Sequence, residues 1–96
     1  MNKYEIMFIV KATIESDQIK ATCENYKKLL TDLKAKIVDF KEMGEKKLAY
    51  EIKGNMNGYY FVMQIEANAD AIKEFDRKAR IDENMIRHLI IKLDEE

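Results

Sequence analysis

The sequence has few of the residues that build metal centres, disulfides and phosphate-binding loops. Its 96 residues include one cysteine, one histidine, three glycines and no proline or tryptophan. Cys23 cannot form an internal disulfide, and a lone His88 rules out a cluster of histidine ligands for a metal. Gly44, Gly54 and Gly58 match neither the Walker nor the dinucleotide-binding pattern. We therefore expect no metal, no cofactor and no small-molecule substrate.

Long apolar runs and flexible linkers are also absent from the sequence. No apolar stretch approaches the ~18 to 20 residues that span a bilayer, and no low-complexity tract divides the chain. Lys3 and Glu5 interrupt any signal-like run after Met1, so we expect a cytoplasmic protein that does not enter a membrane. The length allows one domain over residues 1–96.

The charges nearly balance, but they are unevenly placed. The formal net charge is −1, and a short acidic end over residues 93–96 carries three negative charges, which leaves +2 on the rest of the chain. Hydrophobic residues make up 47% of the sequence, enough for a packed core. A weakly positive body does not indicate a large basic field, and it does not forbid RNA binding.

Hydrophobic periodicity predicts the element order β-α-β-β-α-β. Helices are expected to begin at Ser16 and at Asn68 or Asp70, which can act as caps. Strands are expected over 3–11, 35–53, 59–67 and 85–93, with a bulge or bend at Gly44 and a turn over 54–58. This order is typical of a ferredoxin-like α+β fold, in which two helices cover one face of a four-stranded antiparallel sheet. Strands one and three are then central, and the other face is open.

Alternation along the strands predicts which residues face the helices. Phe61 and Met63 are expected to pack inward with Leu48, Tyr50 and Ile52. In the last strand, two inward sets are plausible: Ile86, His88 and Ile90, or Arg87, Leu89 and Ile91. The residues expected on the open face form an apolar patch, which a lone monomer rarely leaves exposed. We interpret it as a protein-partner face made of Met7, Ile9, Tyr60, Val62, Leu89 and Ile91.

The sequence contains no arrangement of residues that is typical of catalysis. His88 has no predictable nucleophile or orienting carboxylate, and Cys23 lies on the expected buried stripe of a helix. We therefore predict that the protein is not an enzyme. One alternative is a homodimeric α+β sensor of a small molecule, or a cofactor-free enzyme, that uses the open face. This alternative requires polar groups that converge on a pocket, and the sequence offers only His88 and the tyrosines.

Four segments closely resemble a known family, the sixth protein of the bacterial small ribosomal subunit. The similarity covers essentially the whole chain, and the pieces Leu-Ala-Tyr and Gly-Tyr-Tyr are specific at their spacing. The matching segments are KYEIM over 3–7, GEKKLAYEI over 44–52, GYY over 58–60 and IDENMIRH over 81–88.

The resemblance implies a non-catalytic ribosomal protein of ferredoxin-like fold. Such proteins pair with small-subunit ribosomal protein eighteen, and the pair binds the central domain of the small-subunit ribosomal RNA. The resemblance also favours an outward Arg87. Carried onto matching positions, it implies RNA contacts at Lys3, Tyr4, Lys46, Lys47 and Arg87.

Two departures from the family pattern concern the proposed RNA contacts. Glu51 stands where the family often has proline, and it places a negative charge near these contacts. Lys46 and Lys47 stand where arginines are common, so a two-point phosphate contact becomes a point-charge contact. We therefore expect this hairpin to supply only part of the RNA affinity.

Overall fold

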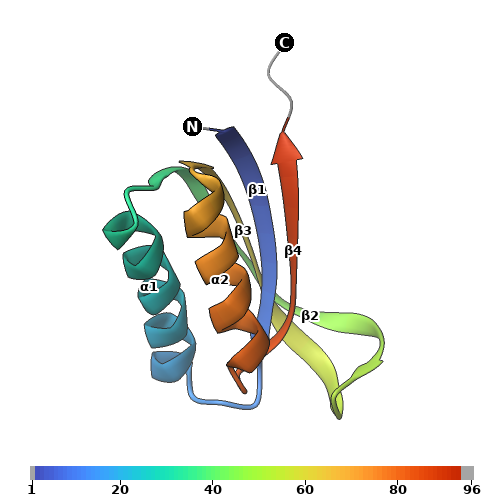
Figure 1. Cartoon of the computed structure of the whole chain (residues 1–96). Helices are drawn as coiled ribbons and strands as arrows, with labels where there is room; N and C mark the ends of the chain where they lie inside the picture. Colours follow the sequence, from blue (N-terminus) through green and yellow to red (C-terminus); the bar gives the residue numbers. More distant parts are fainter. Residues whose placement is uncertain (1, 94–96) are drawn as a thin grey trace.

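The computed structural model describes residues 2–93, and its elements follow the predicted order (Figure 1). The acidic residues 94–96 lie outside the described part of the chain. The elements are β1 (Asn2–Lys11), α1 (Ser16–Asp32), β2 (Lys36–Ile52), β3 (Asn55–Ala67), α2 (Ala69–Ile81) and β4 (Met85–Leu93).

The four strands form one antiparallel sheet in the order β2-β3-β1-β4. The central positions of β1 and β3 confirm the prediction, and so do the two helices that lie together on one face (Figure 1). Because both described helices lie on the same face, the opposite face of the sheet has no helix over it. The observed architecture is the ferredoxin-like α+β fold.

The main core lies between the sheet and the two helices. Phe8 of β1 and Phe61 of β3 are fully buried, with ring centroids 5.2 Å apart. Tyr26 of α1 lies 5.1 Å from Phe75 of α2, so aromatic rings from both layers meet in this core. The burial of Met63 with Phe61 confirms the predicted parity of β3.

The helices begin where the sequence predicts, but their capping differs from the expectation. The residues at the cap positions are Glu15 and Asn68, and neither side chain makes a cap hydrogen bond. Asp17 and Asp70 lie in the first turns, where a negative charge interacts favourably with the helix dipole. Cys23 is buried on the inner stripe of α1, and burial raises the pKa of its thiol to about 12. A thiol with this pKa is a structural core residue.

The hairpin between β2 and β3 is longer than the sequence suggested. Its turn consists of Lys53 and Gly54, both with positive φ, while residues 55–58 continue the strand. Gly44 also has a positive φ, and the β2–β3 register shifts beside it, which confirms the predicted bulge. From Gly44 to Gly58, the two strands form an arm that extends beyond the helices (Figure 1).

The arm packs on the open face, so the expectation that Leu48, Tyr50 and Ile52 face the helices is wrong. Leu48 is buried in a second, smaller cluster with Ile9 and Ile86, and Ile52 packs against it. Residues 48–51 of β2 lie opposite Met56 alone in β3, so this segment bends out of the regular ladder. No helix lies beside the arm in the described part of the chain, and Leu48 and Ile52 pack against the other face of the sheet instead.

A bulge in β4 determines which residues of this strand face the helices, a point that the sequence left open. Ile9 pairs with Arg87 and Val10 pairs with Met85, so Ile86 is an extra residue. Met85 lies in the main core, whereas Ile86 joins the second cluster. His88 then points toward the helices and Arg87 lies outward.

Gly58 lies where the arm meets the open face. A Cβ atom at this buried position would overlap Cγ2 of Ile9, and its backbone does not have a positive φ. Space, rather than backbone conformation, therefore requires glycine here. Ile9 cannot move aside easily, because it is β-branched and buried.

We expect the substitution Gly58→Ala to lower the free energy of unfolding by about 1 to 3 kcal/mol, the usual cost of overpacking. Chemical denaturation of the purified chain measures this change. Asn57→Ala, at an exposed neighbouring position, serves as the control and should change stability by less than about 0.5 kcal/mol.

The contact with Ile9 can be tested in a double-mutant cycle. Ile9→Ala makes room beside position 58, so Gly58→Ala should cost less in that background than in the natural sequence. An equal cost in both backgrounds would contradict the proposed contact.

Candidate interface on the open face of the sheet

The middle of the open face carries a band of apolar side chains from three strands. Met7 of β1 pairs with Val62 of β3 on one side and with Leu89 of β4 on the other. Leu89 and Ile91 are each 44% exposed, while Met7 and Val62 are half-buried. We call these four residues the apolar band.

Two residues of the predicted apolar patch are less available than expected. Ile9 has the predicted outward orientation, but it is only 4% exposed because Leu48 and Ile86 pack over it. Tyr60 is half-buried and packs against the same cluster. The bend of the arm, which strand parity does not reveal, covers this part of the face.

Exposed cations lie on the arm and on the neighbouring part of β4. Lys46 and Lys47 are exposed on β2, Lys53 is exposed at the turn, and Arg87 is exposed on β4. The Nζ atom of Lys46 lies 5.9 Å from the ring centroid of Tyr60. We call these four cations, which lie at the arm end of the sheet, the basic end.

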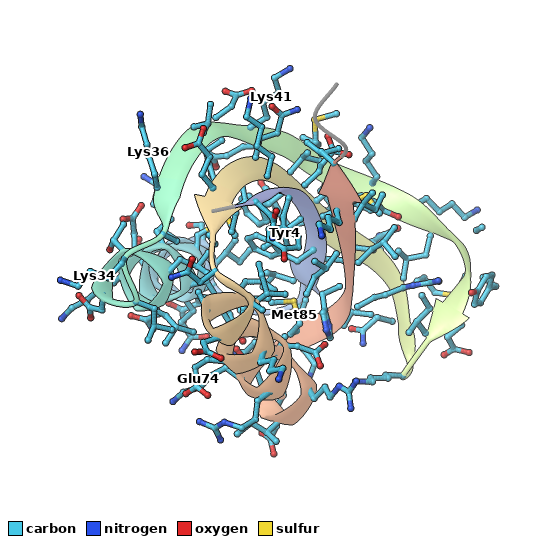
Figure 2. The ribbon with its side chains drawn as sticks, turned by 45° about the horizontal axis from the view of Figure 1, so that its top comes forward. Tyr4, Lys34, Lys36, Lys41, Glu74 and Met85 are labelled. Atoms are coloured by element: carbon cyan, nitrogen blue, oxygen red, sulfur yellow. The ribbon has the colours of Figure 1, made fainter. Side chains whose placement is uncertain are left out.

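The structure does not bring Lys3 and Tyr4 to this basic end. Lys3 is exposed, but it lies at the opposite end of β1 beside Glu66, about 20 Å along the strand from Ile9. Tyr4 is only 8% exposed and belongs to the main core. Figure 2 shows Tyr4 in the middle of the molecule, whereas Lys36 and Lys41 project outward. The ring of Tyr4 therefore offers little surface to a ligand.

A groove of about 270 Å³ runs between the arm and the open face. Its lining includes Met7, Tyr50, Arg87 and Leu89. Tyr50 is 62% exposed, and its hydroxyl accepts a hydrogen bond of 3.1 Å from Nη1 of Arg87. The sequence pattern predicted Tyr50 in the core. The alternation within one strand could not predict its position in this groove.

His88 faces α2, where it is part of a structural network. Its Nε2 lies 2.7 Å from Oδ1 of Asp76, and its ring packs edge-on against Phe75. Arg80 binds the other carboxylate oxygen of Asp76 at 3.0 Å. The hydrogen bond with His88, followed by the charge of Arg80, holds the pKa of Asp76 below its ordinary value. These contacts join β4 to α2.

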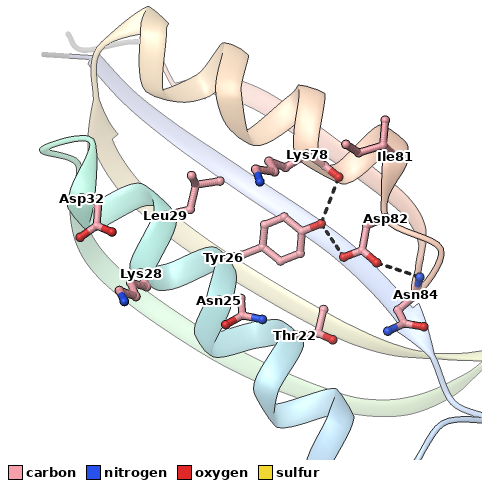
Figure 3. Close-up of a pocket in the computed structure, with 10 residues that line it drawn as sticks. All are labelled: Thr22, Asn25, Tyr26, Lys28, Leu29, Asp32, Lys78, Ile81, Asp82 and Asn84. Atoms are coloured by element: carbon pink, nitrogen blue, oxygen red, sulfur yellow. Dashed lines mark hydrogen bonds between the residues drawn. The ribbon is translucent and has the colours of Figure 1, made fainter.

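A second hollow, of about 600 Å³, lies between the two helices (Figure 3). Tyr26 donates a hydrogen bond of 2.7 Å to Oδ2 of Asp82, and Oδ1 of Asp82 accepts one from the backbone N–H of Asn84. Burial, followed by this hydrogen bond to Asp82, raises the pKa of Tyr26 far above its ordinary value. These hydrogen bonds among Tyr26, Asp82 and Asn84 fix α1 to the loop after α2.

The described residues contain neither a metal-binding cluster nor a membrane-spanning helix. Residues 2–93 contain no cluster of three or more histidine, cysteine, aspartate or glutamate side chains that could hold a metal ion. None of the helices within that range is long and apolar enough to cross a membrane.

The fold and this surface define a ferredoxin-like α+β domain with an open, partly apolar sheet face. The sequence matches the ribosomal protein S6 family over residues 3–92, and the chain belongs to that family. A similar solved structure is the 30S ribosomal protein S6 from Thermotoga maritima, with a TM-score of 0.91 and 28% sequence identity. The match covers 96% of this chain and 87% of that one.

Family membership decides between the predicted functions. The chain is a structural component of the small ribosomal subunit in the cytoplasm, and it is not an enzyme. The prediction of a ribosomal protein is confirmed, and the alternative of a cofactor-free enzyme is wrong.

The network around Asp76 predicts a pH-dependent contribution to stability. The pKa of Asp76 is lower in the folded chain than its ordinary value of 3.8, so its contribution is complete above pH 3.8 and is lost as the pH falls through the folded pKa. We expect Asp76→Asn to lower the melting temperature near neutral pH, with a difference that shrinks below pH 3.8. Thermal unfolding at a series of pH values measures this difference.

Glu83→Gln is the control for this experiment, because it removes an exposed carboxylate just beyond α2. It should leave the melting temperature nearly unchanged over the whole range. A deficit of Asp76→Asn that stays constant from neutral to acidic pH would show that its carboxylate charge is not what stabilises the fold.

Proposed function

We propose that the chain binds the central domain of the small-subunit ribosomal RNA as one half of a heterodimer with small-subunit ribosomal protein eighteen. The observation that carries the proposal is the position of the apolar band on the open face beside Lys46 and Arg87 of the basic end. The apolar band provides the protein contact, and the basic end provides phosphate contacts.

A protein is the occupant that suits the apolar band. Leu89 and Ile91 are each 44% exposed, and their strand neighbours Met7 and Val62 are half-buried. Exposed apolar area gains free energy when a partner removes it from water. The band lacks the clustered cations that phosphates require, so we assign it to protein eighteen.

The basic end suits RNA because its cations are exposed and lie at the margin of the apolar band. Lys46, Lys47 and Arg87 are the proposed phosphate contacts, and Lys3 is a separate contact at the far end of the sheet. We leave out Tyr4 because it is buried. Because these cations are few, they bind RNA only weakly on their own. Docking of the partner adds a second surface beside them.

The proposal predicts that the isolated chain binds small-subunit ribosomal RNA weakly and that protein eighteen increases its affinity. The affinity of the pair should fall steeply with salt, because the contacts displace counterions from phosphates. Lys46→Ala/Lys47→Ala should weaken RNA binding about tenfold or more without changing the melting temperature. Titration of labelled ribosomal RNA, with and without the partner, measures these affinities.

A matched control removes the same charge from the helix side of the molecule. Lys20→Ala/Lys28→Ala replaces two exposed lysines of α1 and should leave RNA binding nearly unchanged. Equal RNA affinity with and without protein eighteen would contradict the heterodimer. A stable homodimer that binds no ribosomal RNA would contradict it as well.

A further inference from the structure

Tyr50 is a large aromatic residue that contributes to neither hydrophobic cluster. It is 62% exposed, although Leu48 and Ile52 on either side of it are anchored in the second cluster. The backbone that carries Tyr50 is therefore held in place on both sides while the ring is exposed to solvent. A tyrosine ring has only two side-chain torsions to fix, so it makes a contact at low entropic cost.

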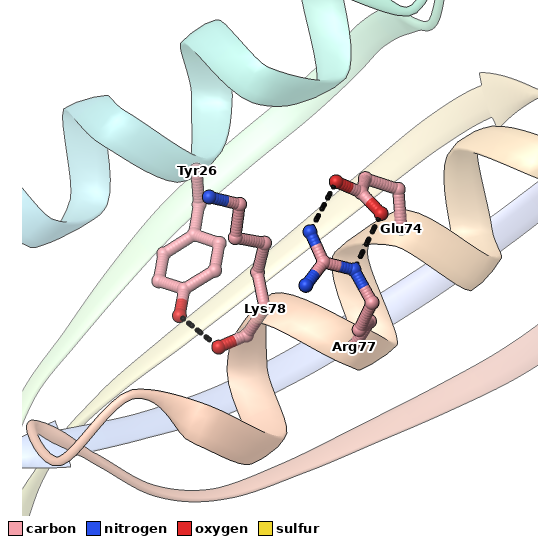
Figure 4. Close-up of polar contacts among 4 residues, drawn as sticks. All are labelled: Tyr26, Glu74, Arg77 and Lys78. Atoms are coloured by element: carbon pink, nitrogen blue, oxygen red, sulfur yellow. Dashed lines mark hydrogen bonds and ion pairs between the residues drawn. The ribbon is translucent and has the colours of Figure 1, made fainter.

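Arg87 differs from the other two arginines in its partner. Arg77 and Arg80 form ion pairs with Glu74 and Asp76 on α2, and Figure 4 shows the two-point contact between Arg77 and Glu74. Among the ion pairs of residues 2–93, none involves Arg87, whose Nη1 instead donates to the neutral hydroxyl of Tyr50. The guanidinium is thus oriented without its charge being neutralised, and its other N–H groups are available as donors.

We propose that Tyr50 is an RNA-contact residue that forms, with Arg87, a site for one unpaired nucleotide. The ring stacks on the base, and the guanidinium beside it binds a neighbouring phosphate. The hydroxyl of Tyr50 accepts from Arg87 and keeps its own O–H to donate to an RNA oxygen. The site rests on the RNA binding proposed above and adds a contact through base stacking.

Two observations favour RNA over a protein as the occupant of this site. Tyr50 lies on the arm that carries Lys46, Lys47 and Lys53, whose charges attract phosphates. Its hydrogen-bond partner is an arginine without a carboxylate partner in the described part of the chain. An unpaired nucleotide is required because bases within a duplex stack on one another and expose no face to the ring.

Three substitutions separate the ring, the hydroxyl and the guanidinium. Tyr50→Leu removes the ring and should weaken binding of the heterodimer to small-subunit ribosomal RNA by about 5- to 150-fold, the range observed for base stacking. Tyr50→Phe keeps the ring and should cost only a few-fold. Arg87→Gln should reduce the slope of log affinity against log salt by about one, whereas Tyr50→Leu should leave this slope unchanged.

A second probe tests the requirement for an unpaired base. Oligouridine should quench the tyrosine fluorescence of the natural chain, which contains no tryptophan, and an RNA duplex of equal length should quench it less. Tyr50→Leu should abolish this difference. Ile81→Ala, at a residue of α2 that is 67% exposed, is the control and should behave like the natural chain.

The outcomes separate this inference from the function on which it rests. If Tyr50→Leu binds ribosomal RNA normally while Lys46→Ala/Lys47→Ala binds weakly, the nucleotide site is wrong and the RNA-binding function stands. If both bind normally, the basic end is not an RNA surface. If Tyr50→Leu weakens binding to protein eighteen in the absence of RNA, Tyr50 belongs to the protein interface and the nucleotide site is overturned. Melting temperatures of all variants show whether each one is folded.

Discussion

The close approach of Gly58 to Ile9 determines how the open face is divided. Because position 58 has no side chain, the hairpin arm can bend over the sheet and bury Leu48 against Ile9 and Ile86. A larger residue at 58 would push the arm outward and uncover this small cluster. The accessible part of the face, and the position of its cations, depend on that one contact.

The two hydrophobic clusters have different tasks in the molecule. The main cluster joins the sheet to both helices and stabilises the fold, as it does in other two-layer α+β domains. The second cluster is small and lies on the face without helices, where it fixes the arm that presents Lys46, Lys47 and Tyr50. The part of the sheet it leaves uncovered is the apolar band, so the packing of the arm separates the proposed protein surface from the proposed RNA surface.

The sequence predicted the fold well because its strands and helices alternate with clear periods. The inward parity of Phe61 and Met63, the bulge at Gly44 and the central positions of β1 and β3 all follow from local patterns. The arm was predicted incorrectly. The alternation of Leu48, Tyr50 and Ile52 indicates that they share a face, but it does not indicate whether that face is the one covered by the helices.

The same limit applied to the candidate interface. Four residues of the predicted partner face form the apolar band, but Ile9 is covered by a segment more than thirty residues away in the sequence. Only the hydrogen bond between Tyr50 and Arg87 indicates that Tyr50 belongs to the candidate interface. This bond joins two strands at opposite edges of the sheet. Contacts of this kind depend on tertiary bending, and no periodicity within one strand encodes them.

The central claim is that one face of the sheet binds a protein and RNA at two adjoining places, and NMR of the labelled chain tests it most directly. Addition of protein eighteen alone should shift the methyl signals of Met7, Val62, Leu89 and Ile91, and later addition of ribosomal RNA should shift signals of Tyr50 and Arg87. Signals of Ile81 on the helix side should change little in both steps. Shifts that cluster on α1 and α2 instead would contradict the account.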